Sequence, residues 1–279
     1  IYTYDVFLSL QKLSGEKVKE DFILNTDGFK AEHGFVSIVA KDDEGFLITW
    51  LDGRNTVEKD DEGNHKPMTV RFAEITNAGD IINEVELDAS VCDCCQTSIT
   101  NTDKGPLVVY RDRTKEEVRD IYVTRNIDDK WETPASVHND GWVIYGCPVN
   151  GPKVVSSANN VAVSWFTVYE GKPRVNISFS KSYGSSFDAP IQINDHNAIG
   201  RVDVVYLNDK EVLVSYMEGD DFDTYLRLKK VSMDGKVSEP ITISKIDSGR
   251  NTGVPQLEIL NDEVFIVWTV FEDENNQLK

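Results

Sequence analysis

The chain has 279 residues, of which 40% are hydrophobic and 28% are charged, and this is enough apolar sequence to build a substantial core. Its 48 Asp and Glu residues outnumber its 29 Lys and Arg residues, for a formal net charge of -19. This acidic excess disfavours a nucleic-acid partner and an anionic membrane surface, because both need basic patches. No apolar run reaches the roughly 18 to 20 residues of a transmembrane helix, so we expect a soluble chain without a membrane span.

A short strand that ends in an aromatic residue recurs along the chain. Its five copies are residues 46–50, 106–110, 161–165, 212–216 and 264–268, which end in Trp50, Tyr110, Trp165, Tyr216 and Trp268. The steps between these aromatic residues are 60, 55, 51 and 52 residues. A repeat of about 50 residues is typical of a four-stranded propeller blade. We therefore expect the five aromatic residues to pack in the core.

The remaining strands can be placed around the five copies in chain order. Residues 4–9 and 22–25 are predicted to be the third and fourth strands of a half-blade. The predicted innermost strands are residues 35–39, 96–100, 153–156, 202–206 and 255–259, and the predicted third strands are residues 69–74, 120–124, 174–179 and 225–230. The last repeat has only two strands, and only residues 114–119 have a helical pattern.

The sequence therefore predicts an all-β fold, a β-propeller of four-stranded blades that forms a single domain over residues 1–279. Residues 1–28 and 250–279 are each expected to contribute half a blade. Pairing of these ends would close a five-bladed ring and remove exposed sheet edges. Alternatively, the chain is a fragment of a longer propeller, and six blades are expected if upstream sequence is missing.

A degenerate turn motif, SKSYGSSF, lies at residues 180–187. It resembles the Asp-box, or bacterial neuraminidase repeat, with Ser182 where that repeat has Asp. The chain as a whole resembles bacterial sialidase-like propellers in five stretches: CDCCQT (92–97), YRDR (110–113), RDI (119–121), GCPVNGP (146–152) and GRVD (200–203). The resemblance implies a six-bladed propeller and a glycan ligand, although a fold alone does not fix a function.

In an antiparallel blade, the loops after strands 2 and 4 lie on one face, where binding residues are expected. The resemblance to sialidases implies arginines that hold a sugar carboxylate and acids that assist hydrolysis. The candidate substrate-binding residues are Arg111, Arg113, Arg119, Arg201 and Arg250, and the candidate catalytic acids are Asp112, Asp203 and Glu218. The alternative is that these charges form ion pairs between blades.

The four cysteines also fall on this face, as Cys92, Cys94, Cys95 and Cys147. One interpretation is that they form disulfides between neighbouring blades in an oxidising compartment. Another is a soft metal site, in which the thiolates and His33 bind copper or zinc. A third is a nucleophilic cysteine with His33 or His138 as its base.

The leading functional hypothesis is an exported sialidase-like propeller that binds, and in its enzymatic form hydrolyses, a glycan on the arginine and cysteine face. The alternatives are a non-enzymatic copper- or zinc-binding propeller and a disulfide-stabilised interaction scaffold. We expect a periplasmic, secreted or cell-surface monomer whose partner is a glycan or another small molecule. The chain begins with Ile1 without a leader sequence, so we expect that any signal peptide was removed or lies upstream.

Overall fold

The computed structural model describes residues 3–220, 222–249, 252–272 and 275–279. β-Strands dominate the described chain, and its helical elements are two short 3₁₀ helices, η1 (Asp42–Glu44) and η2 (Arg54–Val57). The chain divides into two compact units. Unit 1 contains Ile1–Ala135 and Val143–Val149, and unit 2 contains Ser136–Trp142 and Asn150–Lys279. None of the described helices is long and apolar enough to cross a membrane.

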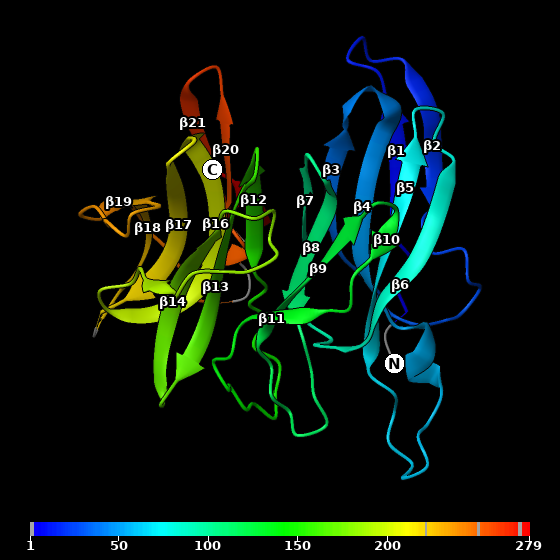
Figure 1. Ribbon diagram of the computed structural model, residues 1–279, viewed down its shortest axis with the longest axis horizontal. Helices are drawn as coiled ribbons and strands as arrows, with labels where there is room; N and C mark the ends of the chain where they lie inside the picture. Colours follow the sequence, from blue (N-terminus) through cyan, green and yellow to red (C-terminus); the bar gives the residue numbers. More distant parts are fainter. Residues whose placement is uncertain (1–2, 221, 250–251, 273–274) are drawn as a thin grey trace. The chain divides into compact units, whose positions relative to one another are not determined.

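Unit 1 contains two sheets that follow the chain order, together with an N-terminal hairpin (Figure 1). The hairpin consists of β1 (Phe7–Gln11) and β2 (Lys17–Ile23). The first sheet has the order β3 (His33–Lys41), β4 (Gly45–Asp52), β5 (Met68–Thr76) and β6 (Ile81–Val91). The second sheet has the order β7 (Ser98–Thr102), β8 (Gly105–Arg111), β9 (Ile121–Ile127) and β10 (Lys130–Trp131). Strand β11 (Ala135–His138) follows in sequence.

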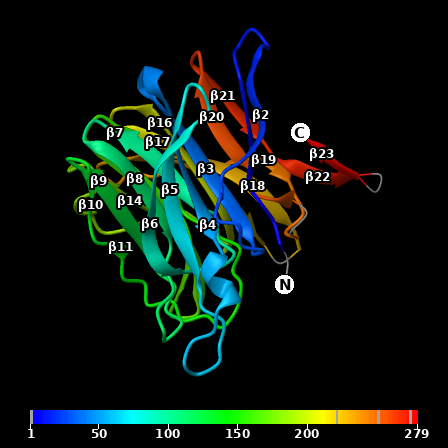
Figure 2. The same cartoon turned by 90° about the vertical axis from the view of Figure 1, so that its right-hand side faces the viewer.

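Unit 2 repeats the same antiparallel meander. One sheet has the order β12 (Lys153–Ser157), β13 (Asn160–Tyr169), β14 (Lys172–Ser180) and β15 (Ile191–Gln192). The next has the order β16 (Asn197–Asn208), β17 (Glu211–Gly219), β18 (Thr224–Ser232) and β19 (Ile241–Lys245). Two hairpins complete the unit, β20 (Gln256–Leu260) with β21 (Glu263–Val267) and β22 (Thr269–Glu272) with β23 (Asn275–Leu278) (Figure 2).

The predicted blade pattern is confirmed in the described chain. Each predicted aromatic strand is the second strand of its sheet or hairpin, namely β4, β8, β13, β17 and β21. A four-stranded antiparallel meander in chain order is the unit of a β-propeller. The turn at residues 180–187 joins the third and fourth strands of its sheet, and Ser180 Oγ accepts hydrogen bonds from the amides of Ser182 and Gly184. The number of blades and the single domain remain predictions, as does the assignment of residues 1–28 and 250–279 to half-blades.

Four of the five aromatic residues of the repeat lie in the core, as predicted, whereas Trp268 is only partly buried. Trp50, Trp165 and Tyr216 are 0% exposed and Tyr110 is 1% exposed. Glycine begins two of the aromatic strands because the neighbouring third strand passes close by. A Cβ on Gly45 would lie 2.0 Å from the carbonyl oxygen of Ile75, and a Cβ on Gly105 would lie 2.4 Å from that of Asn126.

The helix predicted at residues 114–119 does not form. Thr114 Oγ1 instead accepts hydrogen bonds from the amides of Glu116 and Val118, and the Val118 carbonyl accepts one from the Thr114 amide. Glu117 has a φ of 61°, which lies outside the right-handed helical region. Local side-chain hydrogen bonds therefore replace the helix that the composition favours.

Candidate functional site

An aromatic residue followed two positions later by an acid marks the end of three second strands. The three pairs are Trp50 and Asp52 of β4, Tyr110 and Asp112 at the end of β8, and Tyr216 and Glu218 of β17. Because side chains alternate along a strand, the two members of each pair share one face of the sheet. All three acids are buried. The repeat therefore allows the surroundings of three equivalent carboxyl groups to be compared.

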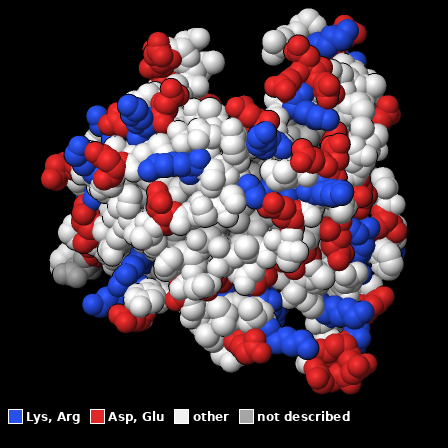
Figure 3. Space-filling view, in the orientation of Figure 1, with Lys and Arg blue, Asp and Glu red and all other residues white. Residues whose placement is uncertain are grey.

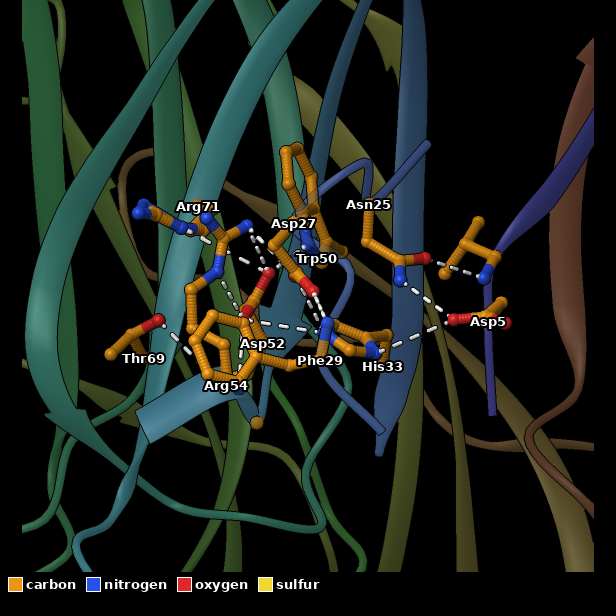
Figure 4. A network of polar contacts seen from close by, with 12 residues as sticks. Asp5, Asn25, Asp27, Phe29, His33, Trp50, Asp52, Arg54, Thr69 and Arg71 are labelled. Carbon is orange, nitrogen blue, oxygen red and sulfur yellow. Dashed lines mark hydrogen bonds and ion pairs between the residues drawn. The ribbon is translucent and has the colours of Figure 1, made fainter. Parts of the chain in front are cut away.

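Asp52 lies among cationic side chains (Figure 4). Arg54 Nη2 is 2.8 Å from Asp52 Oδ2, and Arg71, which pairs with Trp50 across the sheet, has its Nε 3.9 Å from the same oxygen. The Trp50 indole donates a third contact, at 2.9 Å. Burial by itself would raise the pKa of Asp52, but hydrogen bonds from His33 and Arg54 hold that pKa well below its ordinary value. Asp52 is therefore ionised.

Glu218 has a similar cationic partner. Arg227 pairs with Tyr216 across the sheet, and its Nη1 lies 3.1 Å from Glu218 Oε1. Glu218 Oε2 accepts hydrogen bonds from the backbone amides of Asp195 and His196, at 2.8 and 2.9 Å. The carboxylate therefore ties the start of β16 to β17.

Asp112 differs from both equivalents because Tyr122 occupies the position that faces the aromatic residue. Among the residues that the structure describes, no cation forms an ion pair with Asp112, and the charges that act on it include those of Asp88 and Asp120. Burial, reinforced by these two carboxylates, raises the pKa of Asp112 from 3.8 to about 7. Asp88 also accepts a 2.6 Å hydrogen bond from the Tyr110 hydroxyl. The protonated form of Asp112 is therefore well populated near neutral pH.

Asp112 lines a cavity of about 900 Å³ in unit 1. This volume suits a small ligand, since typical ligand sites enclose about 300 to 1,000 Å³. The cavity is lined by Asp60, Asp61, Glu62, Asn64, His65, Lys66, Pro67, Ser90, Asp112, Arg113, Thr114, Lys115 and Glu117. A second cavity of about 390 Å³ shares His65, Lys66 and Arg113 with the first. We call the larger space the Asp112 cavity.

Glu117 also lines the Asp112 cavity, and two arginines hold its carboxylate. Its carboxylate oxygens lie 2.7 Å from Arg113 Nη2 and 2.6 Å from Arg119 Nη2. Arg113 Nη1 also contacts Asp93 at 2.8 Å. Although burial opposes ionisation, the two guanidinium groups lower the pKa of Glu117. The Asp112 cavity therefore contains a carboxyl group with a raised pKa, Asp112, and one with a lowered pKa, Glu117.

The cysteines gather beside the same arginines. Cys94 and Cys147 form a disulfide, whereas Cys92 and Cys95 are buried thiols that are not disulfide-bonded. The Sγ atom of Cys92 is 3.3 Å from that of Cys95 and 3.2 Å from Arg119 Nη1. The hydrogen bond with Cys95, opposed by burial, lowers the pKa of the Cys92 thiol to about 6. The disulfide interpretation therefore accounts for two of the four cysteines.

His33, predicted as a metal ligand with the cysteines, has other partners for both ring nitrogens. Its Nε2 lies 3.0 Å from Asp27 Oδ2, and its Nδ1 lies 3.0 Å from the carbonyl oxygen of Tyr4 (Figure 4). Arg54 Nη2 is 3.2 Å from the same Asp27 oxygen. Asp27, His33 and Asp52 could together offer metal-ligating atoms. Because these groups already satisfy one another and Arg54, we interpret them as a structural network that secures the N-terminal segment.

The remaining candidates of unit 2 contact backbone atoms. Arg201 Nη1 donates to the Gly253 carbonyl at 2.7 Å. Asp203 Oδ2 accepts the amide of Leu257 at 2.9 Å, so both residues link β16 to the segment around β20. In unit 1, Arg111 Nη1 donates to the Arg119 carbonyl at 2.6 Å. Arg250 lies outside the described residues.

The comparisons with known proteins identify the fold. No family model matches the sequence, and no curated protein matches it. Among solved structures, the Hadza microbial sialidase Hz136 aligns over 92% of this chain and 58% of its own, with 10% identity and a TM-score of 0.57. The NanB sialidase from Streptococcus pneumoniae aligns over 91% of this chain and 59% of its own, with 8% identity and a TM-score of 0.56. The chain folds as a sialidase-like β-propeller. It thus spans less than two thirds of the length of these two sialidases.

Within this propeller, the structure brings two predicted residues, Asp112 and Arg113, together at the Asp112 cavity. Glu117 and Asp88 were not among the site residues predicted from the sequence. The spacing of Glu117 between Arg113 and Arg119 is a signal that could have identified it. Figure 3 shows acidic and basic side chains interspersed on one face, so simple charge density does not distinguish such a site.

Proposed function

We propose that this propeller binds a glycan in the Asp112 cavity and hydrolyses a glycosidic bond there, with Asp112 as the proton donor. The observation that carries the proposal is the departure of Asp112 from its repeat. Arg71 and Arg227 stand opposite Trp50 and Tyr216 and form ion pairs with Asp52 and Glu218. Tyr122 stands opposite Tyr110 instead, and Asp112 lines a cavity. A buried carboxyl without a cationic partner destabilises a fold when it ionises, so its retention beside a cavity suggests a functional role.

The chemistry requires two carboxyl groups in different protonation states. One must be protonated, so that it can donate a proton to the leaving oxygen, and the other must be ionised, so that it can activate water or attack the sugar. Asp112, whose pKa is raised to about 7, suits the first role. Glu117, whose pKa is lowered, suits the second. The two environments thus separate acid from base within one cavity.

A neutral glycan fits the charges of the cavity better than an acidic one. Arg113 already contacts both Glu117 and Asp93, so a sugar carboxylate would have to compete with two protein carboxylates. Arg111 and Arg119 are buried and bond to backbone or to Glu117 and Cys92. The rim supplies polar groups suited to sugar hydroxyls, such as Asp60 and Asn64. We therefore propose a neutral sugar at the cleavage site.

The disulfide supports our proposal that the protein acts outside the reducing cytosol. Cys94 and Cys147 lie 53 residues apart in sequence, and disulfides of this kind persist in oxidising compartments. We propose a secreted, periplasmic or cell-surface location. Counting the free thiols of protein isolated from that compartment tests it, with two per chain expected and four contradicting it.

The function is tested with a panel of aryl glycosides of neutral pentoses and hexoses and an aryl sialoside. We expect turnover of at least one neutral glycoside, and Asp112→Asn should reduce kcat by about 100- to 10,000-fold, the usual contribution of a general acid. Asp103→Asn is the matched control, because it changes an exposed acid between β7 and β8, outside the lining of the Asp112 cavity, and should retain the activity. Equal rates for wild type and Asp112→Asn would contradict the proposal.

A further inference from the structure

Four sulfur atoms lie together in unit 1, next to the Asp112 cavity but separate from its proposed chemistry. Cys92 follows β6, Cys94 and Cys95 lie in the next turn, and Cys147 comes from the segment Val143–Val149. The sulfur atoms of Cys92, Cys94 and Cys95 all lie within 4.8 Å of one another, and Cys147 is bonded to Cys94. We call these residues the cysteine cluster.

The spacing within the cysteine cluster matches that of a tetrahedral thiolate site. A Zn–S bond of about 2.3 Å in tetrahedral geometry places the sulfur atoms about 3.8 Å apart. Cys92 Sγ lies 3.3 Å from Cys95 Sγ and 3.9 Å from Cys94 Sγ. Small side-chain adjustments would therefore place these three sulfurs at metal-binding distances. The fourth sulfur becomes available when the Cys94–Cys147 disulfide is reduced.

The charge around the cysteine cluster favours a divalent ion. Four thiolates around a divalent ion leave two net negative charges, and burying them requires compensation. Two buried arginines lie at this position. Arg119 Nη1 donates to Cys92 Sγ at 3.2 Å, and Arg111 Nη1 donates to the Arg119 carbonyl at 2.6 Å. Arg119 also pairs with Glu117 at 2.6 Å, so the two arginines offset part of the charge of a zinc tetrathiolate. Such hydrogen bonds to ligand atoms also tune and orient metal sites.

The backbone holds both halves of the cysteine cluster without help from the disulfide. The Cys92 amide donates to the Arg111 carbonyl at 2.9 Å. Val143 forms an antiparallel bridge with Val118, and the Ile144 amide donates to the Glu117 carbonyl at 3.1 Å. These bonds keep the segment that carries Cys147 beside the other cysteines after reduction.

We propose that the reduced cysteine cluster binds one Zn²⁺ ion through Cys92, Cys94, Cys95 and Cys147. The disulfide and the zinc tetrathiolate are then two alternative states of the same four sulfur atoms. Reduction breaks the S–S bond and adds two electrons and two protons, which a small dithiol supplies as it becomes a cyclic disulfide. Zinc binding then displaces one proton from each of the four thiols. Oxidation of the cluster by a small disulfide reverses both changes and releases the ion.

The experiment compares metal binding by the oxidised and the reduced protein. Thiol titration first defines the two states, with two accessible thiols expected after unfolding the oxidised protein and four after unfolding the reduced protein. Co²⁺ then serves as the spectroscopic probe under anaerobic conditions, because tetrahedral thiolate ligation gives intense absorption, and Zn²⁺ displaces it. We expect one Co²⁺ and one Zn²⁺ per reduced chain, and little binding to the oxidised chain.

Cys95→Ser and Cys147→Ser test the ligands, and His65→Ala is the control for adventitious binding by an exposed histidine. Loss of an outer hydrogen-bond partner typically lowers metal affinity by about 10- to 100-fold. Because each cysteine is a direct ligand, each cysteine variant should lose more Zn²⁺ affinity than this. His65→Ala should bind as wild type does. If a cysteine variant fails to fold, protection of all four wild-type thiols from alkylation by one equivalent of Zn²⁺ provides the same test.

Three results would overturn the proposal. The first is a reduced wild-type chain that binds no Zn²⁺. The second is unchanged Zn²⁺ affinity in folded Cys95→Ser. The third is one equivalent of Cu⁺ bound without any affinity for Zn²⁺, because the site would then select a monovalent ion. Glycoside hydrolysis enters none of these measurements, so the zinc site and the proposed function are tested independently.

Discussion

Replacing Tyr122 with arginine would give Asp112 the cation that its equivalents already have. Arg71 and Arg227 occupy the matching positions opposite Trp50 and Tyr216. We expect Tyr122→Arg to return the pKa of Asp112 from about 7 toward its ordinary 3.8. A change of about 3 pKa units corresponds to about 4 kcal/mol. At pH 6, the protonated fraction of Asp112 should fall from about 90% to about 1%.

The assay is a carbon-13 NMR titration of the Asp112 carboxyl, with Asp112→Asn used to assign the resonance. Tyr122→Phe is the matched control, since it keeps the ring and adds no charge, and it should leave the pKa of Asp112 near its wild-type value. The pH–rate profile provides a second readout. Activity should decline above about pH 7 in wild type, where Asp112 loses its proton, and at distinctly lower pH in Tyr122→Arg. An Asp112 that titrates near 4 in wild type, or near 7 in Tyr122→Arg, would refute the reasoning.

Three further predictions concern stability, measured by urea denaturation. Folding raises the pKa of Asp112 from 3.8 to about 7, so its contribution to stability is lost as pH rises through this window, and Asp112→Asn should be more stable than wild type at pH 8 by up to about 4 kcal/mol; a less stable variant would contradict this. Asp52→Asn should lose about 1.5 to 3 kcal/mol at pH 7, because it removes the buried carboxylate that accepts hydrogen bonds from Arg54 and the Trp50 indole; a loss under 1 kcal/mol would contradict the assigned network. Cys147→Ser should lose up to about 4 kcal/mol relative to the oxidised wild type, since the disulfide with Cys94 closes a loop of 53 residues; reduced wild type is the control.

The strands were predictable because the repeat combines two signals. Alternating apolar residues define each second strand, and an aromatic residue fixes its register relative to the core. Trp50 and Trp165 are accordingly fully buried in β4 and β13. The helix predicted at residues 114–119 was wrong because helix-forming composition is a weak signal. There, the Thr114 hydroxyl and the Glu117 ion pairs fix a turn that composition does not reveal.

The candidate site was only partly predictable. The sequence placed Asp112 and Arg113 on a binding face, but the candidate arginines Arg111 and Arg119 are buried beside the cysteines. Asp112 differs from Asp52 and Glu218 because it lacks an arginine partner. This difference is apparent only when each residue of the second strand is matched with its partner on the third strand. An alignment of the third strands shows Tyr122 where β5 and β18 have Arg71 and Arg227, and where β14 has Asn176. The strand register that makes Tyr122 equivalent to Arg71 and Arg227, the pairing of Tyr110 with Tyr122, comes from the structure.

The cysteine pairing could not be decided from spacing. Cys94 pairs with Cys147 across 53 residues, while Cys92 and Cys95 stay reduced although their sulfur atoms are 3.3 Å apart. Four cysteines allow three pairings if all are oxidised, and none of these describes the observed state. The segment that carries Cys147 is positioned by its bridge to Val118, a long-range contact that no local motif encodes.

The most direct test of the central claim compares two substrates that share a sugar but differ in leaving group. A general acid matters most when the leaving oxygen is basic, and little when it departs readily as a dinitrophenolate. We predict that Asp112→Asn loses about 100-fold or more in kcat on an alkyl glycoside, and far less on the dinitrophenyl glycoside of the same sugar. Equal losses on the two substrates, or no loss on either, would contradict the assignment of Asp112 as the proton donor.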